Sequence, residues 1–130
     1  MDTDLNGKVA IVTGGSRGIG KAISAELASA GAKVMITSRK AEACEEAVNE
    51  IVSETGGELA FEAGNAGRVE DIDRVVEATL STFGSVDILI NNAATNPYAG
   101  PTIDVDVPRW DKTIEVNLTG PLLWLSLIHI

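Results

Sequence analysis

The sequence predicts an α/β fold built on a doubly wound parallel sheet. The run Val9–Val12 is wholly apolar and ends in glycines, which is typical of a strand buried on both faces of such a sheet. Short apolar runs and amphipathic stretches then alternate along the chain, and this alternation favours parallel strands joined by right-handed helical crossovers. With 130 residues, 45% of them hydrophobic and 22% charged, the chain fits one ordinary globular domain.

The first half of the chain predicts two strand–helix units. After the strand at 9–12, a helix that stops at Gly31 is indicated by apolar residues at helical spacing, namely Ile19, Ala22, Ile23, Leu27 and Ala30. The second strand is expected at 34–36. The helix that follows ends at Gly56-Gly57, and its inward stripe is expected to comprise Ala43, Ala47, Val48, Ile51 and Val52.

The second half repeats this pattern. A short strand is expected at 59–61, followed by a helix that ends at Gly84. The stripe of that helix comprises Val69, Ile72, Val75, Val76, Thr79, Leu80 and Phe83. A fourth strand is expected at 86–90, where Asp87 predicts a structural carboxylate that accepts hydrogen bonds from nearby loops. A loop rich in Asn, Ala, Gly and Pro leads to a helix from Pro108, one face of which carries Trp110, Ile114 and Leu118.

The turn between the first strand and the first helix carries Gly14, Gly18 and Gly20 in the pattern T-G-x-x-x-G-x-G. Glycines in this context let backbone N–H groups and a helix N-terminus approach a pyrophosphate, and the helix dipole favours the anion. In a doubly wound sheet, the loops after the first, second and fourth strands meet at the carboxyl ends of the strands. We therefore expect one ligand site at that end.

Three motifs in the same order make the chain resemble the short-chain dehydrogenase/reductase family. They are the glycine turn at 13–20, Asn91-Asn92-Ala93-Ala94 after the fourth strand, and Glu115-Val116-Asn117-Leu118-Thr119-Gly120 in the last helix. The resemblance runs from Leu5 to about Leu123. It implies a Rossmann-type doubly wound parallel sheet, truncated after the fourth strand and the start of the following helix. Residues 1–130 would then be an incomplete NAD(P)-binding Rossmann domain without its C-terminal catalytic part.

The resemblance also implies which residues bind the cofactor. These are Gly14, Ser16, Arg17, Gly18, Ile19, Gly20, Ser38, Arg39, Asn65, Ala66, Asn92, Ala93 and Ala94. Asn65 stands near the family's Asp, or similar polar residue, that contacts the adenine amino group, and a turn-forming Asn is an equally open interpretation. Ala94 stands where the family has Gly, and its methyl group narrows the permitted backbone conformations.

The tip of the second strand predicts a preference for NADP, with NAD still possible. An NAD-specific site places Asp or Glu there to bind the ribose 2′-hydroxyl, whereas this chain has Ser38-Arg39-Lys40. Arg39 offers a planar fork suited to a 2′-phosphate, and Arg17 is placed to close on the same phosphate from the glycine turn. One arginine alone would be interpreted as a solvated surface charge, but two at these loops favour the phosphate.

Asn117 corresponds to the Asn of the family's catalytic tetrad, which holds a water of the proton relay. A polar residue in the middle of a helix also predicts a local distortion. The family's Ser and Tyr-x-x-x-Lys follow the tetrad Asn by a few dozen residues, and this chain ends before them. The only tyrosine, Tyr98, precedes Asn117 and is followed four residues later by Thr102, so it does not fit that motif. The resemblance therefore implies an inactive fragment of a reductase. Such an enzyme transfers hydride between a nicotinamide cofactor and a ketone, 3-oxoacyl thioester or secondary alcohol.

A second function class stays open, namely a non-catalytic dinucleotide-binding module, which would not need the missing half. A methyltransferase of similar fold is disfavoured, because that chemistry does not require Asn91-Asn92-Ala93 together with Asn117. Within the family, residues 92–98 resemble carbonyl reductases and 3-oxoacyl-acyl-carrier-protein reductases. The implied partners are a small carbonyl or alcohol substrate and, at full length, further copies of the chain.

Composition narrows the setting of the protein. A net charge of −9 argues against nucleic-acid binding through a basic face. The single cysteine, Cys44, permits no internal disulfide, and a single histidine, His129, argues against a His-rich metal site, so we expect no metal. The acidic N-terminus carries no signal segment, and the apolar run 122–130 is far shorter than the roughly 20 residues of a membrane span. We therefore expect a cytoplasmic protein.

The last residues, Trp124–Ile130, are nearly all apolar and lack a helix cap. They are either a helix buried in an oligomer interface or a stretch that is not native to the protein. On either interpretation the fourth strand lacks its next neighbour, which leaves an open hydrophobic edge. We expect the isolated chain to be poorly soluble or to associate through that edge and tail.

Overall fold

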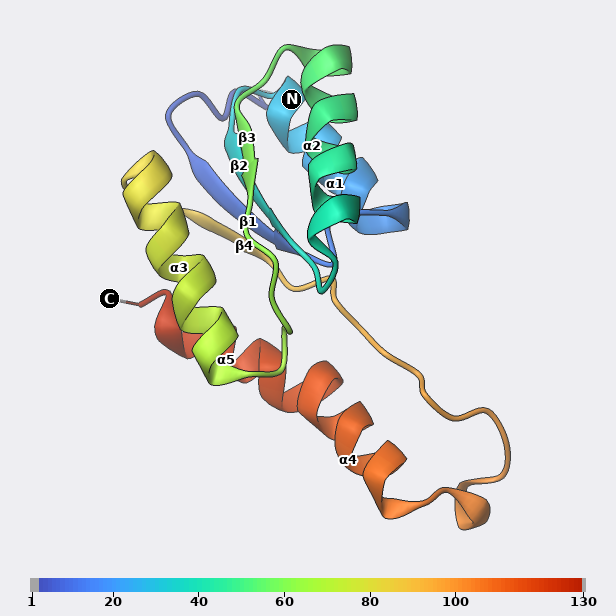
Figure 1. Ribbon diagram of the computed structural model, residues 1–130. Coiled ribbons are helices and arrows are strands. Elements are labelled where there is room, and N and C mark those ends of the chain that lie inside the picture. The colour runs from blue at the N-terminus through green and yellow to red at the C-terminus, as the bar shows by residue number, and fades with distance from the viewer. Residues whose placement is uncertain (1–2, 130) are drawn as a thin grey trace.

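The computed structural model describes residues 3–129, in which helices cover both faces of a parallel sheet (Figure 1). The strands are β1 (Val9–Thr13), β2 (Lys33–Thr37), β3 (Leu59–Phe61) and β4 (Ile88–Ile90). Their order in the sheet is β3-β2-β1-β4, and every pair of neighbours is parallel. The predicted doubly wound Rossmann-type sheet is therefore confirmed for the described residues.

Helices α1 (Gly18–Ser29) and α2 (Ala41–Thr55) lie on one face of the sheet, and α3 (Val69–Phe83) and α5 (Gly120–Leu127) on the other. A short 3-10 helix (Thr102–Asp104) and α4 (Val107–Ile114) follow β4, and a π-helical segment (Glu115–Thr119) joins α4 to α5. The third strand and α3 have the predicted bounds, and α2 and α3 end at the predicted glycines.

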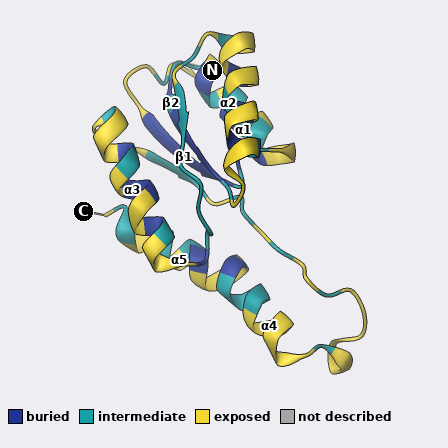
Figure 2. Ribbon diagram, in the orientation of Figure 1, coloured by how far each residue is buried: buried dark blue, intermediate teal, exposed yellow. Residues whose placement is uncertain are grey.

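The two faces of the sheet carry separate parts of the core because successive strand residues point to opposite sides. Val12 and Ile36 pack with residues of α1 and α2, whereas Ile11 and Met35 pack with residues of α3 and with Trp124 of α5. Every residue of β1 is buried, as the apolar run predicted (Figure 2). This central strand therefore places its carboxyl end, and the glycine turn after it, in the middle of the molecule.

Helix α1 buries small residues rather than the apolar residues whose spacing predicted the helix. Its buried residues are Gly20, Ser24 and Ala28, while Ile19 is 74% exposed. A Cβ atom on Gly20 would overlap the carbonyl oxygen of Gly14, so the helix begins in direct contact with the turn. Only small side chains fit along a helix that lies this close to the sheet. The larger apolar side chains of this helix lie beside that face, where Ile23 and Leu27 are half-buried and Ile19 is exposed.

Strand β4 begins at Ile88 rather than at the predicted position 86. Asp87 precedes the strand and is exposed, but its Oδ2 accepts hydrogen bonds from the N–H of Val9 (2.9 Å) and the hydroxyl of Ser85 (3.2 Å). The N–H of Asp87 in turn donates to the carbonyl of Val9 (2.8 Å). The predicted structural role is confirmed, although the partners include the first residue of β1 as well as a loop.

The π-helical segment changes which residues of the last helices face inward. Val116, within this segment, is buried, whereas Trp110 is 51% exposed and Leu118 is 65% exposed. A π-helical turn interrupts the regular 3.6-residue period, so a stripe extrapolated from α4 does not continue past it. Of the three residues that the sequence placed on one face, Trp110 and Leu118 are exposed and Ile114 is half-buried. Figure 2 shows that α4 itself is largely exposed.

The apolar C-terminal run forms α5 and packs partly on the rest of the chain. Trp124 is buried against α3, and its Nε1 donates a hydrogen bond to the carbonyl of Ala66 (3.1 Å). Leu122 and Leu125 are exposed. Ile130 lies outside the described residues. Within residues 3–129, no helix combines the length and the apolar character needed to cross a bilayer.

These exposed groups generate a prediction about self-association. The outer edge of β4 has no neighbouring strand among residues 3–129, and Leu122 and Leu125 add apolar surface on α5. We expect light scattering on the isolated 130-residue chain to report oligomers or aggregates at micromolar concentration. Replacing both leucines with lysine should reduce the mean mass. A stable monomer of the unmodified chain would contradict this prediction.

Candidate dinucleotide-binding site

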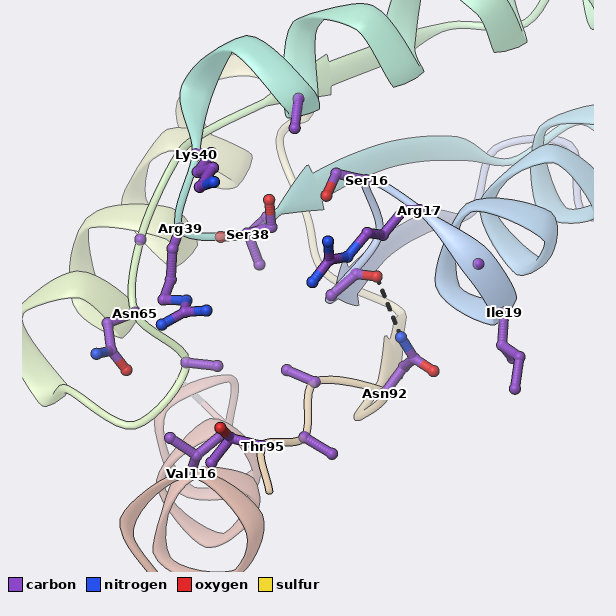
Figure 3. Close-up of a pocket in the computed structure, with 18 of the residues that line it drawn as sticks. Ser16, Arg17, Ile19, Ser38, Arg39, Lys40, Asn65, Asn92, Thr95 and Val116 are labelled. Atoms are coloured by element: carbon purple, nitrogen blue, oxygen red, sulfur yellow. Dashed lines mark hydrogen bonds between the residues drawn. The ribbon is translucent and has the colours of Figure 1, made fainter. Parts of the chain in front are cut away.

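A cleft of about 460 Å³ opens at the carboxyl ends of β1, β2 and β4. Its size lies within the range of small-molecule sites. The predicted residues that line it are Gly14, Ser16, Arg17, Gly18, Ile19, Ser38, Arg39, Asn65, Ala66, Asn92, Ala93 and Ala94. Figure 3 shows Arg17, Arg39, Asn65 and Asn92 around one space. The lining residues come from the glycine turn, the tip of β2, the loop after β3 and the loop after β4. The three loops expected to meet therefore do so, and the loop after β3 joins them.

Two glycines shape the turn on which the cleft is built. Gly14 has a positive φ of 63°, and a Cβ there would come within 2.9 Å of Nδ2 of Asn92. Gly20 does not line the cleft, although it was predicted to bind the cofactor. It lies in the contact between α1 and the turn, where no side chain fits. Its role in the described structure is to let the helix N-terminus reach the turn.

The hydroxyl of Thr13 ties the end of β1 to the Asn motif that follows β4. It accepts hydrogen bonds from the N–H groups of Asn92 and Ala93, both at 3.0 Å, and donates to the carbonyl of Ile90 (3.3 Å). The side-chain amide of Asn92 donates to the carbonyl of Gly14 (3.1 Å). These bonds fix the Asn motif beside the glycine turn, which is the sheet-steadying arrangement that the resemblance implied.

The tip of β2 gives the cleft a positive wall. Arg17, Arg39 and Lys40 are exposed, and none of them forms an ion pair within residues 3–129. Figure 3 shows Arg17 and Arg39 reaching into the space between the glycine turn and the loop that carries Asn65. Ser38 directly precedes Arg39, and its hydroxyl oxygen is 3.1 Å from the sulfur of the buried thiol of Cys44. Free cations at this position can bind an anion.

Asn65 forms the turn that one of the two open interpretations required. Its Oδ1 accepts a hydrogen bond from the N–H of Gly67 (2.9 Å), and its own N–H donates to Oδ2 of Asp71 (2.8 Å). The carbonyl oxygen of the neighbouring Ala66 accepts a hydrogen bond from the indole N–H of Trp124. The loop is therefore held in shape by contacts directed away from the cleft.

Asn117 lies in the π-helical segment and does not line the cleft. The predicted local distortion is thus confirmed at this residue. Its Oδ1 accepts from the N–H of Thr95, and its Nδ2 donates to the carbonyl of Thr95, both at 2.8 Å. The amide therefore pairs with both backbone polar groups of one residue in the loop that follows the Asn motif. This contact holds Ala94 and Thr95 at the mouth of the cleft.

Sequence reasoning missed several residues of the lining: Thr37, Lys40, Ala43, Gly64, Thr95, Lys112 and Val116. Lys112 and Val116 are four residues apart on one helical path, a spacing that could have indicated a shared face. Thr37 has a buried hydroxyl with no hydrogen-bond partner among residues 3–129. No local pattern distinguishes it from an ordinary strand residue.

The order of the sheet and a glycine turn beside a cleft at the strand ends define a Rossmann-type α/β protein. The sequence profile described as short chain dehydrogenase matches residues 8–128. The chain therefore belongs to the short-chain dehydrogenase family of oxidoreductases.

Individual relatives agree with this assignment. Dehydrogenase/reductase SDR family member 4 of Homo sapiens is 40% identical over 124 residues, which is 95% of this chain and 44% of that protein. A metagenomic short-chain oxidoreductase solved in complex with NADP has a TM-score of 0.88 and 39% identity, covering 95% of this chain and 55% of that one. L-Sorbose reductase from Gluconobacter frateurii, complexed with NADPH and L-sorbose, has a TM-score of 0.91 and 31% identity. The match to that reductase covers 97% of this chain and 48% of the reductase. The chain spans about half the length of the curated relatives it matches.

The role of Thr13 can be tested by an isosteric substitution. Thr13→Val should destabilise the protein by about 1–3 kcal/mol, because it removes the acceptor of the half-buried Ala93 N–H and leaves the Asn92 N–H with only the Ile90 carbonyl. Thr79→Val is the matched control, since the equally buried Thr79 hydroxyl only donates to the Val75 carbonyl within α3. Urea unfolding should show a larger loss for the first variant. Equal losses would contradict the role given to Thr13.

Proposed function

We propose that the protein is an NADP-preferring reductase or dehydrogenase, and that the cleft holds the dinucleotide. The observation that carries the proposal is the wall formed by Arg17, Arg39 and Lys40, which has no carboxylate beside it at the tip of β2. A 2′-phosphate is a dianion near neutral pH and would gain charge-assisted hydrogen bonds from these groups. The NADP and NADPH in two similar structures support this proposal.

The glycine turn fits the pyrophosphate of such a cofactor. Gly18, the first residue of α1, lines the cleft, and a Cβ there would have open space around it. The N-terminus of a helix offers unpaired N–H groups and a favourable dipole to an anion. Ser16, Gly18 and Ile19 line this part of the cleft and are proposed to contact the cofactor.

The bound cofactor would supply or accept the hydride of the reaction. Reduction of a carbonyl also requires a proton on the oxygen, and this chain contains no Tyr-x-x-x-Lys to deliver it. Tyr98 donates its hydroxyl hydrogen to the carbonyl of Pro101 (3.0 Å) and lies outside the cleft lining. We therefore propose that residues 1–130 form the cofactor-binding part of a larger catalytic unit. Asn117 would serve that unit by positioning the loop at Thr95.

The substrate is proposed to be a ketone, a 3-oxoacyl thioester or the corresponding secondary alcohol. The support is the resemblance of residues 92–98 to carbonyl reductases and 3-oxoacyl-acyl-carrier-protein reductases. A non-catalytic dinucleotide-binding module is the second candidate, because the cleft is formed without a family proton donor in this chain. Cofactor binding without carbonyl reduction by the complete gene product would favour this second candidate.

Cofactor preference tests the cationic wall. In the complete gene product, Arg39→Asp should weaken NADPH binding by about 1.5–3 kcal/mol and shift preference towards NADH, because a phosphate contact is replaced by a like charge. Arg109→Asp, on exposed α4, makes the same change outside the cleft and should leave the preference unaltered. Calorimetric titration measures both affinities. Equal affinity of the unmodified protein for the two cofactors would refute the proposed preference.

The lack of a proton donor generates a second test. The isolated 130-residue chain should show no carbonyl reductase activity with NADPH in an absorbance assay. Any turnover should be tested in Tyr98→Phe, since Tyr98 carries the only phenolic hydroxyl. Activity that persists through purification and disappears in this variant would show that Tyr98 supplies the proton.

A further inference from the structure

We propose that Asp71 and Arg74 of α3 are positioning residues, which hold loop 63–66 in place as one wall of the dinucleotide cleft. Gly64, Asn65 and Ala66 line the cleft, whereas Asp71 and Arg74 do not. This inference rests on the proposed function, because the wall matters only if the adenosine end of a cofactor packs against it. It adds two charged residues that would control binding without touching the ligand.

Arg74 connects α3 to the segment that leaves β3. Its guanidinium donates three hydrogen bonds: Nε to Oε1 of Glu62 (3.0 Å), Nη1 to Oδ1 of Asp71 (2.9 Å), and Nη2 to the carbonyl of Ala63 (2.6 Å). The donors of a guanidinium lie on three nitrogens in one plane, so Arg74 reaches three separate acceptors, whereas the three donors of an ammonium share one nitrogen. The helix and the first residues of the loop are therefore joined through one side chain.

Asp71 extends the same network to the cleft-lining residues. While Oδ1 accepts from Arg74, Oδ2 accepts the backbone N–H of Asn65 (2.8 Å). The hydrogen bond from Asn65 is the main reason that the pKa of Asp71 lies below its ordinary value, and Arg74 lowers it further. A carboxyl with a lowered pKa in the folded state stabilises that state above its unfolded pKa and loses the effect only as the pH falls through the folded value. The network is therefore intact at neutral pH.

The backbone of the loop lies in close contact with Asp71 at Gly64. A Cβ on Gly64 would lie 3.2 Å from Cβ of Asp71, so the backbone passes directly over the helix. The N–H of Gly64 donates to the carbonyl of Ser38 (2.9 Å), which joins the loop to the tip of β2. Loss of the Arg74 side chain would remove the hydrogen bond to the Ala63 carbonyl, and loss of the Asp71 carboxylate would remove the bond from the Asn65 N–H. The bond from Gly64 to Ser38 would remain in both cases.

A looser wall should weaken the part of the site that NADPH and NADH share. The loop would face the adenosine moiety, whereas Arg17, Arg39 and Lys40 would face the phosphate that only NADPH carries. Substitutions that act through another residue typically change affinity by a factor of about 2 to 30. Loss of Arg74 should therefore lower the affinity for NADPH and the affinity for NADH by the same factor, within this range. Loss of Arg39 should change their ratio.

The experiment compares Arg74→Gln and Asp71→Asn with a matched control in the complete gene product. Arg109→Gln is suitable, because Arg109 also pairs with an aspartate three residues earlier, Asp106, but this pair forms no hydrogen bond to loop 63–66. Calorimetric titration should be carried out with NADPH, NADH and adenosine 2′,5′-bisphosphate. Within each test variant, the affinity for all three ligands should fall by the same factor. The control should bind as the unmodified protein does.

Thermal unfolding without ligand checks that the variants remain folded. If Arg74→Gln does not fold, Arg74→Lys keeps the charge without the fork and should still weaken all three ligands by a common factor. Unchanged binding in folded variants, or a loss confined to NADPH, would overturn the inference and leave the proposed function standing. Failure of the unmodified protein to bind either cofactor would overturn the proposed function and the inference with it.

Discussion

The close packing of the glycine turn, helix α1 and the Asn motif is the constraint on which the site depends. No side chain fits at Gly20, where the helix meets the carbonyl of Gly14, and little room exists at Gly14, where Asn92 approaches. The same proximity limits the buried face of α1 to Gly20, Ser24 and Ala28. The end of β1, the N-terminus of α1 and the loop after β4 are thereby brought to one place.

The loops after β3 and β4, which line the cleft, are fixed by hydrogen bonds with polar side chains outside the cleft lining. The Thr13 hydroxyl binds the backbone of the Asn motif, the Asn117 amide pairs with Thr95, and the Asp71 carboxylate binds the backbone of Asn65. These side chains supply hydrogen-bond partners to backbone groups of the loops that form the cleft. The atoms that face the cleft are therefore left free for a ligand while their positions are restrained.

The electrostatics of the site are local and opposite to those of the whole chain. The net charge of −9 would repel a polyanionic cofactor at long range, but charges beyond about 8 Å are largely screened at physiological ionic strength. Within that distance, an anion in the cleft would meet the cations at the glycine turn and at the tip of β2, which form no ion pair with any described residue, and also Lys112. The position of a few charges matters more for this site than their sum.

The sequence by itself determined the succession of strands and helices and most of the cleft lining. Periodicity and helix-ending glycines act over a few neighbouring residues, which is why β3 and α3 have the predicted bounds and why the loops at the strand ends could be identified. Only the tertiary structure decided that Ile19 is exposed and that Gly20 lies outside the cleft lining, because both depend on how closely α1 approaches the sheet. Likewise, the bonds from Arg74 to Glu62 and from Trp124 to Ala66 join positions 12 and 58 residues apart. Such contacts form only when the chain has folded, and no local pattern encodes them.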